Sequence, residues 1–337
     1  MNPWGPLVTR ARGLSGHLLS RQTLRSLAGS DDRRAFSDAL VRLGYLAFPP
    51  NAPPPDERAI EHALRRVASR RFDVLERWSR DFEDVLVPVI EDEDRRSIRA
   101  LVRGALGGVD PALRTLGLIP TMALPARALD ELALLNDVGA IGAALLALRH
   151  PFAGVVAEQA RRERLDLFSF DQAVVRAWAA RATRAARAGD RALRHYVERT
   201  VDLVNAWAAR LLAEQRSDAE AEALFVEGGP MVRMDDLQFA SESGSVESLR
   251  ERLEPRVAGT PLAVALAPGT RAPDEAALMA LIAEYRRLSR EEPLGLAPVL
   301  LYVMRLRAEH RALQRILWQL SLGVPAEQRL RELEEAA

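Results

Sequence analysis

The sequence predicts an all-α protein built from three similar helical units, and three observations carry that prediction. Alanine, leucine, arginine and glutamate, all good helix formers, dominate the 337 residues. Aromatic residues make up only 5% of the chain, and no alternating apolar stretch is flanked by hairpin turns. One helical pattern also occurs three times along the chain at an almost constant spacing.

In the first third, residues 7–48 are expected to hold two or three helices. Prolines dominate residues 49–55, and because a proline ring fixes its backbone, this segment is predicted to be a stiff exposed connector. Another helix is expected over residues 56–80. The acids Glu91 to Asp94 are interpreted as helix-start charges favoured by the helix dipole, and the repeated helix follows until Gly107 ends it.

The rest of the chain continues as helices separated by glycine and proline turns. Asp171 is predicted to cap a long helix that ends at Arg187, and residues 191–216 form the next one. The loop at 228–230 opens the last third. Further helices are expected over residues 126–149, with a break near Gly139 and Gly142, and over 235–239, 245–253 and 274–290. They are followed by one with Pro298 in its first turn and a last one after Pro325.

The repeated helix is anchored by an acid in each copy. Asp94, Asp202 and Glu309 lie 108 and 107 positions apart, and Asn205 follows Asp202 by three places, on the same helical face. Counted from the acids, the first and third copies carry an apolar stripe typical of a buried helix face, whereas the best stripe of the second copy lies two residues earlier. We interpret the three occurrences of this helix as threefold duplication of one helical unit. The alternative is that helices of similar composition resemble one another. The predicted repeat domains are 1–119, 120–226 and 227–337.

Composition excludes several classes of function. The chain has no cysteine, which excludes disulfides and thiolate metal sites. Its net charge is zero, which argues against a general phosphate-binding role, and no nucleic-acid partner is expected. No signal-peptide pattern is evident, and the longest apolar run, 294–304, is about half of the roughly 20 residues that span a bilayer. No transmembrane segment is therefore expected.

A search for catalytic and metal-binding motifs returns weak candidates only. Two aspartate pairs, 31–32 and 235–236, are similar to the pairs with which isoprenyl diphosphate synthases hold magnesium, but both lack the third acid of that motif. We interpret them as helix caps or solvated turns. Arg181 and Arg184 form a one-sided basic patch at helical spacing. The histidines show no metal-ligand spacing and are expected to be surface or satisfied residues: His17, His62, His150, His195 and His310.

The third copy carries the most specific pattern. Residues 292–303, Glu-Pro-Leu-Gly-Leu-Ala-Pro-Val-Leu-Leu-Tyr-Val, precede Glu309-His310-Arg311-Ala312-Leu313 and then Gly323-Val324-Pro325. This order resembles the C-terminal motif of the C subunit of V/A-type ATPases, whose eukaryotic counterpart is the d subunit. Ser97 and Ala312 stand where that family usually has asparagine. The matching positions, expected to be structural, are Asp94, Ser97, Asp202, Asn205, Pro293, Pro298, Tyr302, Glu309 and Arg311.

The resemblance implies a funnel of three similar helical domains around a pseudo-threefold axis. It implies a non-catalytic central-stalk protein without cofactors, on the cytoplasmic face of the membrane. Such a protein joins the stalk, built of the D and F subunits, to the membrane proteolipid ring, for ion transport, expected to be of protons, linked to ATP synthesis or hydrolysis. The alternatives from the residues alone are a metal-dependent helical enzyme of prenyl-transfer type and a generic helical scaffold.

Overall fold

The computed structural model describes residues 3–48, 55–79, 85–162, 165–214, 220–267 and 273–335. Within these ranges all regular structure is helical and no strand occurs, so the predicted all-α class is confirmed. Most of the proline-rich connector predicted at 49–55 lies outside the described residues. The helices are α1 (Gly5–Ser15), α2 (Arg21–Ala28), α3 (Arg33–Arg42), α4 (Glu57–Ser79), α5 (Val87–Leu106), α6 (Pro111–Arg114), α7 (Ala126–Ala133), α8 (Val138–Ala147), α9 (Ala153–Ala160), α10 (Leu167–Ala188), α11 (Arg191–Ala213), α12 (Ala221–Leu224), α13 (Met234–Ser243), α14 (Val246–Val257), α15 (Pro261–Ala265), α16 (Pro273–Glu291), α17 (Ala297–Ser321) and α18 (Ala326–Glu335).

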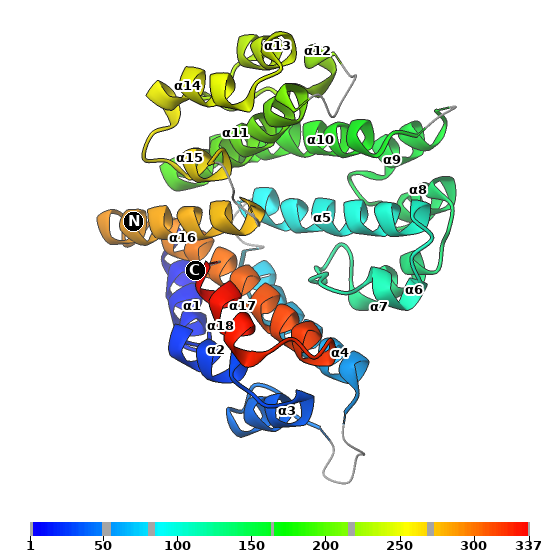
Figure 1. Ribbon diagram of the computed structural model, residues 1–337, viewed down its shortest axis with the longest axis vertical. Helices are drawn as coiled ribbons and strands as arrows, with labels where there is room; N and C mark the ends of the chain where they lie inside the picture. The colour runs from blue at the N-terminus through cyan, green and yellow to red at the C-terminus, as the bar shows by residue number, and fades with distance from the viewer. Residues whose placement is uncertain are drawn as a thin grey trace.

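The three copies of the repeated pattern are the long helices α5, α11 and α17. In Figure 1, α5 lies across the middle of the molecule, with α10 and α11 above it and α17 below. Helix α10 packs against both α5 and α11, and α16 packs antiparallel to α17, to which a short turn joins it. Helix α10 therefore bridges α5 and α11, and α17 contacts α11 directly.

In all three long helices, the buried face is the one predicted by counting from the acid of the repeated pattern. In α11 that face consists largely of alanines, which allow α13 to approach closely. In the stripe that looks more apolar in the sequence, Ala208 is buried, but the three larger residues, Val204, Trp207 and Leu211, are only half-buried. The buried positions are Ile98, Leu101, Val102 and Ala105 in α5, Ala206, Ala209 and Ala213 in α11, and Leu313, Ile316 and Leu317 in α17.

The first and last parts of the chain form one core together. Leu27, Phe36 and Leu64, from α2, α3 and α4, pack with Leu313 and Leu317 of α17. A second small core lies within α11 to α15, and the largest core joins the remaining helices. Helix α18 packs against α2, and α17 packs against α1, so the first and last described helices lie together. The division into repeat domains at 119 and 226 stays a prediction.

Two local predictions are wrong. Helix α5 begins at Val87, so the acids Glu91 to Asp94 lie beyond its first turn, and their side chains are buried and paired, not solvated helix-start charges. Helix α10 begins at Leu167, and its cap is Asp166, which accepts a hydrogen bond from Ser169 N at 2.6 Å. Asp171 instead lies inside α10, where its carboxylate pairs with arginines of α5.

Candidate interaction site

The acid and amide of α11 hold the chain that leads into α13. Asp202 is fully buried, and its Oδ1 accepts hydrogen bonds from Met231 N at 2.9 Å and Val232 N at 3.0 Å. Asn205 donates from Nδ2 to the carbonyl of Val226 at 2.8 Å and accepts from Val226 N at 2.9 Å. Burial raises the pKa of Asp202, while the two backbone N–H groups favour its charged form. The pair therefore fixes the connection at 226–232.

Gly229 lies against this pair, where a side chain has no room. A Cβ atom at this position would be 2.8 Å from Asp202 Cγ and 3.0 Å from Asp202 N. We expect Gly229→Ala to lower the free energy of unfolding, measured by urea denaturation, by about 1–3 kcal/mol because the loop must move away from α11. Gly154→Ala is the control, since a Cβ there meets no atom within 4 Å; it should stabilise by up to about 1 kcal/mol. Equal effects would contradict the steric argument.

The acid of α5 is buried in the same way but has other donors. The hydroxyl of Thr121 donates to Asp94 Oδ1 at 2.6 Å, and His150 Nε2 lies 3.3 Å from Asp94 Oδ2. Thr121 also accepts from Leu124 N at 3.0 Å, so Asp94 organises the segment before α7. Burial raises the pKa of Asp94, and the contact with His150 opposes that rise. Ser97, at the amide position, is buried.

The acid of α17 connects the two ends of the chain. Glu309 is buried and accepts from Leu19 N, from the hydroxyl of Tyr45 at 2.9 Å and from Arg71 Nη1 at 2.6 Å. Burial raises its pKa, and the charge of Arg71 opposes the rise. Ala312 occupies the amide position and is buried. The three acids thus have different hydrogen-bond donors, each from a segment outside the acid's own helix.

The other predicted motif residues surround the start and middle of α17. Pro293 lies in the exposed turn before the helix, and its carbonyl accepts from Arg12 Nη2 at 2.6 Å. Pro298 is buried in the first turn. Tyr302 is fully buried, and its hydroxyl has no hydrogen-bond partner among the described residues. Arg311 is half-buried. Their role as structural motif positions stays a prediction.

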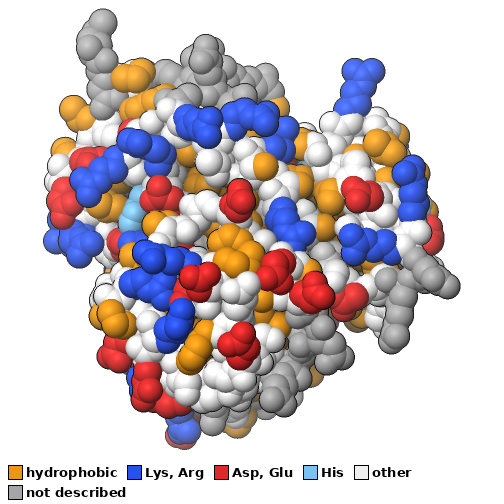
Figure 2. Space-filling view, turned by 90° about the horizontal axis from the view of Figure 1, so that it is seen from above, with side chains coloured by type: hydrophobic (Ala, Val, Ile, Leu, Met, Phe, Trp, Pro, Cys, Tyr) orange, Lys and Arg blue, Asp and Glu red, His pale blue; other side chains and the backbone are white. Residues whose placement is uncertain are grey.

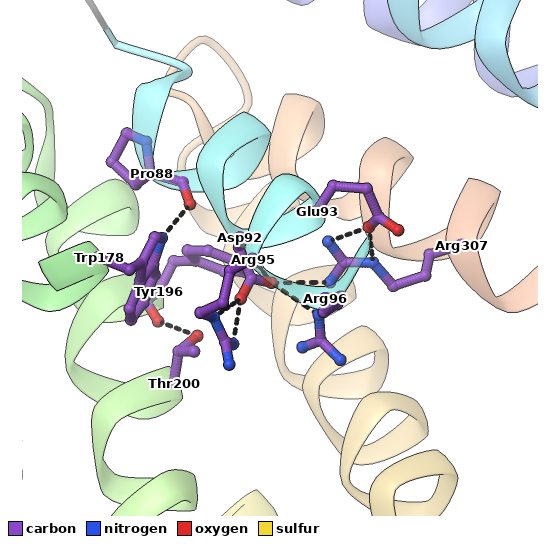
Figure 3. A network of polar contacts seen from close by, with 9 residues as sticks. All are labelled: Pro88, Asp92, Glu93, Arg95, Arg96, Trp178, Tyr196, Thr200 and Arg307. Atoms are coloured by element: carbon purple, nitrogen blue, oxygen red, sulfur yellow. Dashed lines mark hydrogen bonds and ion pairs between the residues drawn. The ribbon is translucent and has the colours of Figure 1, made fainter. Parts of the chain in front are cut away.

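One buried carboxylate joins all three long helices, and the sequence did not reveal it. Asp92 of α5 is fully buried; Tyr196 of α11 donates to its Oδ2 at 3.1 Å, and Arg307 Nη1 of α17 lies 3.2 Å from the same oxygen (Figure 3). Arg95 and Arg96, one turn along α5, pair with it as well. Burial opposes the charge of Asp92, but the arginines hold its pKa well below the ordinary value.

Neighbouring contacts extend this network. Arg307 also reaches Glu93, with Nε donating to Oε2 at 2.8 Å, and Trp178 Nε1 of α10 donates to the carbonyl of Pro88 at 2.9 Å (Figure 3). Arg181 of α10 pairs with Glu91 at 2.7 Å. The side chain of Arg181 is 42% exposed and its charge is paired with a buried carboxylate, whereas Arg184 is exposed; the basic patch of these two arginines stays a prediction.

Beside the network lies a hollow of about 110 Å³ lined by α5, α11, α16 and α17. Its charged lining consists of five arginines and no acid. Asp92 is shared by three of these arginines, and Asp171 is shared by Arg99 and Arg103. Arg307 also pairs with Glu93, so the arginines still outnumber the carboxylates with which they pair. The hollow therefore suits an anionic group. The arginines are Arg95, Arg96, Arg99, Arg307 and Arg311.

The outer surface differs from this hollow. Figure 2 shows basic and acidic side chains interspersed over one face, with hydrophobic side chains between them. That mixture agrees with the net charge of zero. Concentrated positive charge is a property of the hollow, not of this face.

The aspartate pairs are used within the fold. Asp32 caps α3 by accepting from Ala35 N at 2.7 Å, and Asp236 is buried and pairs with Arg252 at 2.9 Å and Arg256 at 2.6 Å. Within the described ranges no group of three or more histidine or acidic side chains could hold a metal ion. No helix in those ranges has the length and apolar character needed to cross a membrane.

One histidine differs from expectation. His310 of α17 is 1% exposed, and neither ring nitrogen has a hydrogen-bond partner in the described part of the chain. Burial, with the charges of Arg311 and Arg65, lowers its pKa to about 3, so the ring is neutral. By contrast, His150 and His195 each contact a carboxylate.

Comparison with known proteins gives one family match. The model of the ATP synthase (C/AC39) subunit family matches residues 7–332, nearly the whole chain. The match covers all three long helices and the hollow between them. No curated protein matches the chain.

Proposed function

The chain belongs to the ATP synthase (C/AC39) subunit family, and we propose that it is the non-catalytic component that joins the central stalk of a V/A-type ATPase to its membrane ring. In this proposal, the D and F subunits form the stalk and the proteolipid ring lies on the other side. The chain then sits peripherally on the cytoplasmic face of the membrane. It couples ion transport, expected to be of protons, to ATP synthesis or hydrolysis.

The observation that carries the proposal is the junction at Asp92, the buried carboxylate that Tyr196 and Arg307 contact from the other two long helices. A part that passes torque between two others must resist deformation, and dense helical cores deform little. The junction ties α5, α11 and α17 to one another through a buried carboxylate and an arginine that lies more than 200 residues away in the chain. We further propose that the three long helices belong to three similar domains around a pseudo-threefold axis, with boundaries at 119 and 226.

The hollow beside the junction is the proposed contact with the stalk. Its lining of arginines favours an acidic stalk end, and charged contacts of this kind are wet and reversible, as a separable rotor needs. Metal-dependent catalysis has less support, because Asp32 and Asp236 are occupied by a helix cap and by ion pairs.

Binding of purified D–F stalk to the chain tests this proposal. Arg96 and Arg99 are 33% and 40% exposed at their side chains, so their replacement by glutamine removes charge from the hollow. Asp92 keeps its pairs with Arg95 and Arg307, and Asp171 keeps its pair with Arg103, so neither buried carboxylate is left unpaired. We expect the double variant to bind the stalk about tenfold more weakly, with a smaller difference at high salt.

The matched control is Arg66→Gln with Arg70→Gln, two exposed positions of α4 away from the hollow. This control should bind as the unaltered chain does. A chain that does not bind D–F at all would refute the function, whereas equal binding by both double variants would refute the hollow as the contact.

A further inference from the structure

A second concave surface lies on a neighbouring face of α16 and α17. This groove, of about 200 Å³, is bounded by α16 and α17, by the connection from α1 to α2, and by α18. Figure 1 shows these elements gathered on one side of the molecule. The groove shares only Leu278 and Arg311 with the lining of the arginine hollow, so it is a different surface.

The floor of the groove is apolar. Leu278, Met279 and Ile282 contribute one stripe of α16, and Leu18 and Leu24 face them from the connection and from α2. The spacing of 278, 279 and 282 is the i, i+1, i+4 part of a single helical face. The α16 lining runs from residue 275 to residue 286, which is about 16 Å of helix. This length matches roughly three turns of an added helix.

The rim of the groove carries cations without partners. Arg305 of α17 is half-buried, and neither its side chain nor the exposed side chains of Arg286 and Arg21 have a hydrogen bond or ion pair to any other described residue. Burial lowers the pKa of Arg305 and the like charge of Arg286 adds to that effect, while the charge of Glu309, which also lines the groove, opposes it. The ion pair of Arg315 with Glu275 closes the opposite end. Arg286 and Arg305 repel each other at the rim, and an acidic partner there would relieve that repulsion.

We propose that this groove docks an amphipathic helix of another component of the complex, with apolar residues on the floor and acidic residues against Arg286 and Arg305. An apolar groove of three turns with a cationic rim fits helix-in-groove recognition, in which anchors at i, i+3 or i+4 and i+7 enter the floor. The inference depends on membership of the complex and not on the stalk contact proposed for the hollow.

A photocrosslink in the assembled ATPase complex tests the proposal. Met279 is replaced by the photoreactive residue benzoylphenylalanine, and the same residue at Arg66 on the exposed face of α4 provides the background. We expect a strong adduct from position 279 to one segment, which mass spectrometry identifies as a helix with apolar residues at helical spacing and flanking acids.

Charge reversal supplies the second arm. Adding Arg286→Glu and Arg305→Glu should lower the adduct yield at 279 about tenfold, because like charges then face the acids of the partner. Arg66→Glu with Arg70→Glu, of equal charge change, should leave the yield unchanged. Adducts to lipid, adducts to a basic or non-helical segment, a yield at 279 no higher than at 66, or insensitivity to reversal at 286 and 305 would each overturn the proposal.

Discussion

Replacing Arg307 with methionine is expected to lower the free energy of unfolding by about 3–5 kcal/mol. The variant leaves Asp92 and Glu93 buried at 0% and 5% exposure without the cation that reaches both. Methionine fills a similar apolar volume, so the loss comes chiefly from uncompensated charge and not from a cavity. Urea denaturation at neutral pH measures the change.

The effect should depend on pH in a defined direction. Despite burial, the arginines lower the pKa of Asp92 in the folded chain, so its contribution to stability is present above the unfolded value and is lost as the pH falls. Without Arg307 the pKa is lowered less. The difference between the two proteins should therefore be largest at neutral pH and shrink as the pH falls below about 4.

Arg305→Met on the same helix is the matched control. Arg305 is half-buried and has no ion pair with a described residue, so its replacement should not lower the free energy of unfolding by more than about 0.5 kcal/mol. A similar loss in both variants, or a loss at Arg307 that does not vary with pH, would show that packing and not the ion network determines the effect.

The helices could be predicted because their signals are short-range. Gly107 ends α5, Pro298 lies in the first turn of α17, and the helix predicted at 274–290 spans 273–291. Hydrophobicity alone misjudged the buried face of α11, because Ala206 is buried whereas the larger Trp207 is half-exposed. Close helix packing selects small residues there, which a scale of side-chain hydrophobicity does not detect.

The junction could not be predicted because half of its contacts join residues that lie far apart in the sequence. The spacing of Asp92 to Arg95 and Arg96 is visible in the sequence as i, i+3 and i, i+4 pairs. Nothing local shows that Arg307 and Tyr196 reach the same carboxylate from other helices. Four adjacent acids in a sequence are typical of a solvated surface. They can be buried here because the fold brings cations close enough to neutralise them.

The three anchor acids show the same limit. Asp94, Asp202 and Glu309 have equivalent places in the pattern, yet one is bound by side chains, one by backbone N–H groups and one by both. A repeated acid predicts a repeated need for hydrogen bonds at that point of the helix. The identity of the donors depends on loops whose lengths differ between copies, so it could not be derived from the repeat.

Replacing Asn205 with leucine is expected to cost about 2–4 kcal/mol, because two buried backbone groups lose their partners together. The side chain of Asn205 bonds both the N–H and the carbonyl of Val226, a residue that is 1% exposed. Leucine has a comparable size but neither donates nor accepts a hydrogen bond. The N–H and carbonyl of Val226 would therefore remain buried without a hydrogen-bond partner. Urea denaturation gives the global loss, and hydrogen exchange at the amide of Val226 gives the local one.

Gln238→Leu separates this effect from a general cost of removing an amide. Gln238 is exposed, and its Nε2 donates to Glu222 at 2.7 Å, so water replaces the lost contact and the change should stay within about 0.5 kcal/mol. In Asn205→Leu the amide of Val226 should exchange much faster than in the control, since its acceptor is gone. Slow exchange at Val226 with a large global loss would instead place the cost in packing around α11, and the amide would then not be what holds the connection at 226–232.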